Sequence, residues 1–255
     1  MRATKAIVRG ISASFRDAVV MHPAAEAIDV VRARAQHAQY VEALREAGLE
    51  VVELPPLDAH PDACFVEDCA LVARGAALIT RPGAPSRRNE ADSIAEALAA
   101  THRVARTQAP ATIDGGDCMR VGTTWFVGQS ARTNAAGAAR VREVFGPLGD
   151  SVIEVPVRDF LHLKCTASCI DERTVLVAEG TVDRAAFAGF DVVTVPREEA
   201  YAANAVVVNG TAIVAKGYPA TRAALERRGL RIIELVLSEI AKADGSLTCM
   251  SILLP

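Results

Sequence analysis

The sequence has few of the features that mark nucleic-acid-binding, exported or membrane proteins. Lysine and arginine (28) nearly balance aspartate and glutamate (31), and aromatic residues make up only 4% of the chain. A chain without basic blocks or interleaved aromatic residues is a poor candidate for binding nucleic acid. The N-terminal apolar run breaks at Arg9, too early for a signal peptide, and no stretch approaches the roughly 18 apolar residues of a membrane span. We therefore expect a soluble, cytoplasmic protein that binds neither nucleic acid nor a membrane.

Cysteine occurs six times, but without the spacing of a disulfide framework or a common zinc site. In a chain that lacks an export signal, free thiols are expected rather than disulfides. The pairs at 64 and 69 and at 165 and 169 depart from C-x-x-C spacing, and both lie in strand-like sequence that suits tetrahedral ligation poorly. We expect plain burial for every cysteine except Cys249. These are Cys64, Cys69, Cys118, Cys165 and Cys169.

Signatures of nucleotide binding are also missing. No G-x-G-x-x-G follows a first strand, and no G-x-x-x-x-G-K occurs anywhere in the chain. These glycine-rich loops allow a backbone to approach a phosphate closely, so nucleotide binding of either kind has little support.

The chain does contain a module that recurs five times. Each copy begins with a short apolar run, continues through a polar loop into a helical stretch, and ends in a second strand; a third strand then leads into the next copy. Apolar residues in the longer helical stretches recur three and four apart, as an amphipathic helix requires. The first strands read AIVRG, ALITRPG, WFVGQ, VLVAEG and AIVAKG, starting at residues 6, 77, 125, 175 and 212. The helical stretches cover 30–48, 89–100, 134–149, 183–190 and 221–229.

The two ends of this pattern indicate a closed ring. The last third-strand segment, LTCMSILL at 247–254, has no downstream partner, and the first strand at 6–10 has no upstream one. Pairing the two would close the ring and leave no exposed edge there. We therefore predict an α/β fold of five strand-helix-strand modules with pseudo-fivefold symmetry, in a single domain over residues 1–255. An open doubly wound sheet is the alternative that fits the same alternation.

The linkers that enter the inner strands of such a ring converge near its axis, and four of the five carry reactive side chains. Singly, each has a structural explanation: a buried histidine with satisfied hydrogen bonds, a tight Gly-Gly turn, or acids facing water. Together they provide a thiol, a base, a carboxylate to orient the base and acids to hold a cation, as nucleophilic catalysis requires. The side chains are those of Asp62, Glu67, Asp68, Asp114, Asp117, His162, Asp244 and Cys249.

Several motifs closely resemble those of the dimethylarginine dimethylaminohydrolases. They are FVEDCALV, ALITRPGAPSRRNE, IDGGDCMR, SARTN, HLKC and DGSLTCMS, and the resemblance spans essentially the whole chain. This family of guanidino-group-modifying enzymes has the five-bladed α/β propeller, or pentein, fold. The resemblance implies hydrolysis of asymmetric dimethylarginine or monomethylarginine to citrulline and a methylamine. Arginine deiminases share GGD and a late cysteine, but they are generally much longer because of a helical insertion.

The resemblance assigns the catalytic roles to three residues. Cys249 attacks the guanidinium carbon to form a covalent thiouronium intermediate, His162 serves first as acid and then as base, and Asp114 orients His162. Some relatives carry glutamate in place of Asp114. A free thiol has a pKa of about 8.5, so we expect Cys249 to stay neutral until the substrate cation favours the thiolate. The scheme needs no metal or organic cofactor, although zinc bound adventitiously at Cys249 would inhibit it.

Substrate recognition is assigned partly from chemistry and partly from the resemblance. A planar guanidinium calls for paired carboxylates, and Asp68 beside Glu67 meets that requirement. An α-carboxylate calls for arginines in bidentate geometry. Arg87 and Arg132 match the family's substrate-binding arginines, whereas Arg88 is expected to be a solvated loop charge. The resemblance adds three further contacts, made by Asp62, by the backbone carbonyl near Ala243 and by Val20 in a mobile lid.

Several alternatives remain open from the sequence. Deimination of unmethylated arginine, or amidino transfer to another amine, would use the same intermediate. A non-catalytic binding protein on the same fold would have no chemical reason to keep this set of reactive side chains. A redox-sensing thiol protein would need a resolving cysteine near Cys249, and none is adjacent in sequence. The sequence also leaves open whether the protein is a monomer or a homodimer, and whether it serves nitric oxide regulation or nutrient scavenging.

Overall fold

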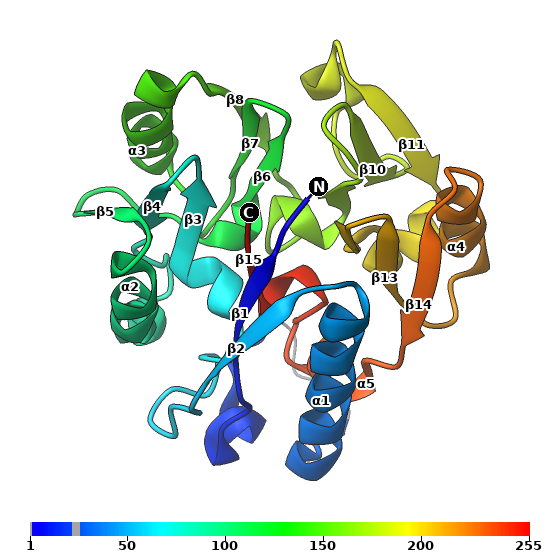
Figure 1. The fold of residues 1–255 in the computed structure, drawn as a ribbon, viewed down its shortest axis with the longest axis horizontal. Helices are drawn as coiled ribbons and strands as arrows, with labels where there is room; N and C mark the ends of the chain where they lie inside the picture. The colour runs from blue at the N-terminus through cyan, green and yellow to red at the C-terminus, as the bar shows by residue number, and fades with distance from the viewer. Residues whose placement is uncertain (1, 22–25) are drawn as a thin grey trace.

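The computed structural model describes residues 2–21 and 26–255, and all that follows concerns these residues. They form five small sheets of three strands each, arranged around a central axis (Figure 1). In every sheet the middle strand pairs antiparallel with one neighbour and parallel with the other. The prediction of five modules around an axis is therefore confirmed, and the single open sheet is excluded.

The strands of each sheet follow the order of the predicted repeat. In four of the five sheets the hairpin strand comes first, the middle strand second, and the parallel strand returns after the connecting helix or turn; in the remaining sheet the antiparallel strand comes from the end of the described chain. In hydrogen-bonding order the sheets are β15 (Ile252–Leu254), β1 (Lys5–Arg9) and β2 (Glu50–Leu54); β3 (Ala70–Ala73), β4 (Ala76–Ile79) and β5 (Arg103–Arg106); β6 (Cys118–Val121), β7 (Thr124–Gln129) and β8 (Ser151–Pro156); β9 (Ala167–Cys169), β10 (Thr174–Ala178) and β11 (Asp191–Val195); β12 (Val206–Val208), β13 (Thr211–Ala215) and β14 (Arg231–Leu235).

The longer α-helices lie on the periphery of the ring, outside the sheets (Figure 1). The first of them begins at a capping residue, Asp29, whose carboxylate accepts hydrogen bonds from the amides of Val31 and Arg32. Its apolar face buries Tyr40 and Leu44 against the first sheet and its neighbours. The helices are α1 (Val30–Glu46), α2 (Asp92–Ala99), α3 (Ala135–Phe145), α4 (Pro219–Glu226) and the short α5 (Ser238–Lys242).

The fourth module differs from the prediction. Residues 183–190 were expected to be helical, but they form only a single 3₁₀ turn, η7 (Arg184–Phe187). The stretch is too short for a stable α-helix, and Gly189, with φ of +88°, turns the backbone into the left-handed region before β11. The fourth sheet is therefore covered by a turn where the other modules have a helix.

The segments leading into the inner strands also differ from the prediction, because each begins with a 3₁₀ turn instead of continuous strand. These turns carry several of the acids and the thiol that the sequence placed where the linkers enter the inner strands. A strand would send successive side chains to opposite faces of a sheet, whereas four turns packed near the axis bring their side chains to one region. They are η2 (Val66–Cys69), η4 (Gly115–Asp117), η6 (Leu163–Cys165) and η9 (Thr248–Met250).

The last strand pairs with the first. β15 runs antiparallel to β1, with Ile252 opposite Ile7, and the amide of Thr4 donates to the carbonyl of Leu254 at 2.9 Å. Figure 1 shows the two strands side by side near the axis. The segment that carries Cys249 is thus held against the first module.

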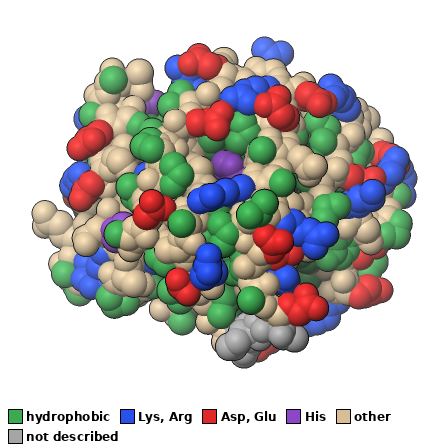
Figure 2. Space-filling view, turned by 90° about the horizontal axis from the view of Figure 1, so that it is seen from below, with side chains coloured by type: hydrophobic (Ala, Val, Ile, Leu, Met, Phe, Trp, Pro, Cys, Tyr) green, Lys and Arg blue, Asp and Glu red, His purple; other side chains and the backbone are tan. Residues whose placement is uncertain are grey.

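The surface is mixed in charge. On the face in Figure 2, acidic and basic side chains are interspersed and the hydrophobic ones are scattered among them. Within the described part of the chain, no helix combines the length and the apolar character needed to cross a membrane.

We predict that Tyr40→Phe destabilises the segment before β15. The Tyr40 hydroxyl and Oγ of Ser251 form a buried hydrogen bond of 2.7 Å, so removing one partner should lower the free energy of unfolding by about 1–3 kcal/mol. Urea denaturation measures the change. Tyr218→Phe, at a half-buried tyrosine, is the control, because no hydrogen bond of its hydroxyl occurs among the described residues. Equal effects of the two substitutions would contradict the prediction.

Candidate active site

Most of the predicted site residues line one small cavity near the axis, which we call the charged pocket. Its volume is about 20 Å³. Glu67, Asp114, Asp117 and Val20 are the predicted residues that do not lie on its wall. The predicted residues that do are Asp62, Asp68, Arg87, Arg132, His162, Ala243, Asp244 and Cys249. The wall is completed by Val19, Phe65, Leu161 and Gly245.

Asp114 fixes the imidazole of His162 from outside the pocket. It is fully buried, and its Oδ2 lies 3.0 Å from Nε2 of His162. Its Oδ1 accepts from the amide of Gly83 at 2.8 Å, and Nη1 of Arg132 donates to Oδ2 at 3.3 Å. Burial lowers the pKa of His162, but Asp68 and the hydrogen bond to Asp114 more than offset this and raise it to about 9. The imidazole is therefore protonated at neutral pH and can donate a proton.

Asp68 is buried and ionised, and Arg87 is its counterion. Its Oδ1 accepts from the amide of Gly116 at 2.8 Å, and its Oδ2 accepts from Nη1 of Arg87 at 2.6 Å. Burial raises the pKa of Asp68, but Arg87 and His162 outweigh it and bring the pKa to about 2. Glu90 holds the other side of Arg87, accepting from Nε at 3.1 Å and from Nη2 at 2.8 Å. In the free protein Arg87 is thus enclosed by two carboxylates, which the sequence did not reveal.

The Cys249 thiol lies half-buried on η9, at the wall of the charged pocket. Burial raises its pKa well above the ordinary value, and the negative charges of Glu67 and Asp68 raise it further. The thiol is therefore neutral in the free protein. Ionisation calls for a positive charge brought close to the sulfur, as a bound guanidinium would provide.

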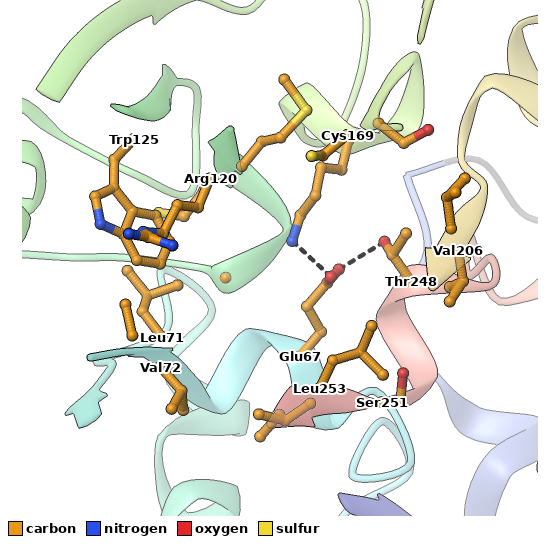
Figure 3. A pocket seen from close by; sticks show the side chains of 18 of the residues that line it. Glu67, Leu71, Val72, Arg120, Trp125, Cys169, Val206, Thr248, Ser251 and Leu253 are labelled. Carbon is orange, nitrogen blue, oxygen red and sulfur yellow. Dashed lines mark hydrogen bonds and ion pairs between the residues drawn. The ribbon is translucent and has the colours of Figure 1, made fainter. Parts of the chain in front are cut away.

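Glu67 and Asp68 are adjacent in sequence but face different surroundings. Nζ of Lys164 donates to one carboxylate oxygen of Glu67 at 2.5 Å, and Oγ1 of Thr248 donates to the other at 2.8 Å (Figure 3). Glu67 lies on the wall of a second cavity of about 40 Å³, which we call the inner pocket. The inner pocket is lined by Glu67, Gly116, His162, Lys164, Cys165, Tyr201, Asn204, Asp244, Ser246 and Cys249.

A much larger cavity, of about 610 Å³, also borders Glu67 and Lys164. Its wall includes Trp125 and Val206 (Figure 3). Size alone would favour this cavity as a binding site. Neither the thiol nor the imidazole reaches it, however, so we place the candidate active site in the two smaller pockets.

The segment that precedes the undescribed residues 22–25 lies against the charged pocket. The amide of Val19 donates to both carboxylate oxygens of Asp62, at 3.1 and 3.2 Å, and the amide of Met21 donates to Oδ2 of Asp244 at 2.5 Å. Val19 lines the pocket, whereas the predicted lid residue Val20 is half-buried beside it. Two carboxylates on the wall of the charged pocket are thus engaged by this segment.

The Gly-Gly pair of the GGD motif is needed for close approach and not only for a turn. A Cβ on Gly116 would lie 2.5 Å from Nδ1 of His162 and 3.1 Å from Oδ1 of Asp68. A Cβ on Gly115 would lie 1.9 Å from the carbonyl oxygen of Glu67. Only residues without a side chain let these segments pack as they do.

Comparison with known proteins identifies the family. A family model described as "N,N dimethylarginine dimethylhydrolase, eukaryotic" matches residues 15–254. The N(G),N(G)-dimethylarginine dimethylaminohydrolase of Pseudomonas aeruginosa is 39% identical over 226 residues, which cover 88% of this chain and 89% of that protein. The chain belongs to the dimethylarginine dimethylaminohydrolase family. A Streptomyces coelicolor family member of the same name is 38% identical over 255 residues, covering 99% of this chain and 97% of that one.

A solved structure of a dimethylarginine dimethylaminohydrolase has the same fold. A cysteine-to-serine mutant of the Pseudomonas aeruginosa enzyme in complex with citrulline matches with a TM-score of 0.95 at 36% identity, and the match covers all of both chains. The pentein fold that the sequence resemblance implied is therefore confirmed.

The raised pKa of His162 predicts how stability depends on pH. Because the pKa rises from about 6.5 in an unfolded chain to about 9 in the folded protein, protonation of His162 stabilises the fold. This contribution is fully present below about pH 6.5 and is lost as the pH rises through about 9. Urea denaturation between pH 6 and pH 9.5 should therefore show a smaller loss of stability in Asp114→Asn than in the wild type. An equal loss in both proteins would contradict the prediction.

Gly116→Ala should displace the His162 imidazole. The added methyl group would lie 2.5 Å from Nδ1, so the ring must shift from the position in which Asp114 and Asp68 raise its pKa, and that pKa should fall toward the ordinary value. Proton NMR titration of the His162 ring, assigned with a His162→Asn variant, measures this pKa. Gly146→Ala is the matched control, because a Cβ there makes only an ordinary contact of 4.0 Å with Cγ of Arg142. An unchanged His162 titration in Gly116→Ala would show the prediction to be wrong.

Proposed function

We propose that the protein hydrolyses Nω-methylated arginines, asymmetric dimethylarginine and monomethylarginine, to citrulline and a methylamine. One observation carries the proposal: the charged pocket holds a thiol, a protonated imidazole and an ionised buried carboxylate, in Cys249, His162 and Asp68. These are a nucleophile, an acid and a partner for a cation. Membership of the dimethylarginine dimethylaminohydrolase family supports the choice of substrate.

The geometry suits a two-stage reaction. The substrate guanidinium lies beside Cys249, whose thiol loses its proton to solvent because the cation stabilises the thiolate. The sulfur forms a bond to the guanidinium carbon, and the carbon–nitrogen bond to the methylated amine breaks as His162 gives that nitrogen a proton. A cationic thiouronium then links substrate and enzyme. Water adds to its carbon while His162 takes a proton, and the carbon–sulfur bond breaks to release citrulline.

The two arginines of the charged pocket differ in how fully the protein's own carboxylates already engage them. The side chain of Arg87 is 5% exposed and is committed to Asp68 and Glu90, whereas that of Arg132 is 15% exposed and makes a longer contact of 3.3 Å with Asp114. We assign Arg132 as the main partner of the substrate carboxylate. Arg87 contributes a second positive charge near that carboxylate, while its own hydrogen bond holds Asp68 in place.

We also propose that the reaction needs no cofactor. The thiol, imidazole and carboxylates supply every group in the scheme, so it uses no metal or organic cofactor. Zinc would inhibit by occupying the site, since ligand atoms of Asp68, Asp114 and His162 lie within 4.8 Å of one another and Cys249 shares the pocket with Asp68 and His162.

We place the enzyme in the cytoplasm as a monomer or homodimer, with a role in arginine metabolism that includes nitric oxide regulation.

The proposal predicts that purified protein forms citrulline from asymmetric dimethylarginine and that Cys249→Ser abolishes this activity. Colorimetric citrulline quantification measures the product, and Cys169→Ser controls for loss of a half-buried thiol elsewhere in the fold. Parallel reactions contain unmethylated arginine. Citrulline from arginine alone would assign the protein to deimination instead, and no citrulline from either substrate in a protein that binds both would favour a non-catalytic role.

A further inference from the structure

The charged pocket and the inner pocket meet at the reacting groups. His162, Asp244 and Cys249 line both cavities. Asp68 and Arg132, the groups suited to the substrate's guanidinium and carboxylate, line only the charged pocket. A substrate whose guanidinium carbon reaches the Cys249 sulfur therefore has one side of its guanidinium toward Asp68 and the other toward the inner pocket.

Most polar groups of the inner pocket are already engaged by the protein. Both oxygens of Glu67 are held, by Lys164 and by Thr248. The Asn204 amide donates to the carbonyl of Lys164 at 2.8 Å and accepts from the Thr248 amide at 2.9 Å. The Tyr201 hydroxyl donates to the Gly245 carbonyl at 2.9 Å. What the pocket offers a ligand is therefore mainly carbon and sulfur surface.

Among the remaining side chains of the wall, Cys165 fits this description, whereas Ser246 and Asp244 add polar atoms. Cys165 is half-buried on η6, and burial raises the pKa of its thiol to about 12, so it stays neutral and behaves as a small apolar group. Ser246 is buried, and its Oγ has no hydrogen-bond partner among the described residues.

The inner pocket also has a suitable size. A cavity needs roughly 10–15 Å³ for the centre of one water molecule. The volume of about 40 Å³ exceeds this minimum, so the inner pocket can receive a small group. A dimethylamino group, with one nitrogen and two methyl groups, is a small group of this kind.

We propose that the inner pocket receives the methylated amino group of the substrate, and that Cys165 determines how many methyl groups fit. This inference rests on the proposed function. It places the leaving nitrogen beside His162, which gives it a proton, while the unmethylated nitrogen faces Asp68. Cys165 is thereby a specificity-determining residue, and the mainly apolar wall favours methyl groups over the two N–H groups of unmethylated arginine.

Cys165→Val tests the proposal, because it replaces the thiol by one methyl group and adds a second. The value of kcat/KM should fall by roughly 10-fold or more for asymmetric dimethylarginine relative to monomethylarginine. Cys169→Val is the matched control, since Cys169 is also half-buried but lines the large cavity and not the inner pocket. It should leave the ratio for the two substrates unchanged.

Cys165→Ala supplies a second test, in which the expected result is a gain of activity that misfolding would not produce. The variant enlarges the pocket, so turnover of Nω-propyl-L-arginine, whose leaving amine has one more heavy atom than dimethylamine, should rise several-fold relative to that of asymmetric dimethylarginine. Unchanged substrate ratios in both Cys165 variants, with wild-type activity on methylated arginines, would overturn the pocket assignment and leave the proposed function intact. Wild-type turnover of unmethylated arginine alone would overturn both.

Discussion

The ion pair between Asp68 and Arg87 is the interaction on which the rest of the site depends. A carboxylate removed from water favours its neutral form, and the guanidinium 2.6 Å away, with His162, keeps Asp68 charged at a pKa of about 2. Its negative charge is in turn the strongest influence that opposes burial on the pKa of His162. A neutral Asp68 would no longer attract a substrate cation, and the pKa of His162 would fall.

Arg87 is shared between Asp68 and Glu90, and the two carboxylates do not benefit equally. Burial raises the pKa of Glu90 to about 7 even though Arg87 opposes the rise. When Glu90 carries a proton, the set of three side chains is neutral overall, which a low-dielectric interior favours. As the pH falls, Glu90 therefore takes up a proton before Asp68 does, and Asp68 remains ionised.

The sequence was informative where structure depends on local pattern. Short apolar strands and amphipathic helices recur with the module, so the ring of five sheets could be predicted, and the unpartnered segments at 6–10 and 247–254 indicated how it closes. The η2 turn could not be predicted, because it depends on contact with Gly115, 48 residues away. The adjacency of Glu67 and Asp68 indicated a shared role. The Glu67 side chain instead pairs with Lys164, 97 residues away, on the wall of the inner pocket. Glu90 likewise gave no signal beyond its place three residues after Arg87.

The charges of the free site explain why a neutral thiol is compatible with catalysis. The carboxylates of Asp68 and Asp114 are already compensated by Arg87, Arg132 and His162. An incoming guanidinium adds a positive charge beside the Cys249 sulfur. Loss of the Cys249 proton is thereby favoured, since the thiolate becomes a counterion of the substrate. Nucleophile and substrate thus become reactive together, and a pocket without the cation keeps its thiol protonated.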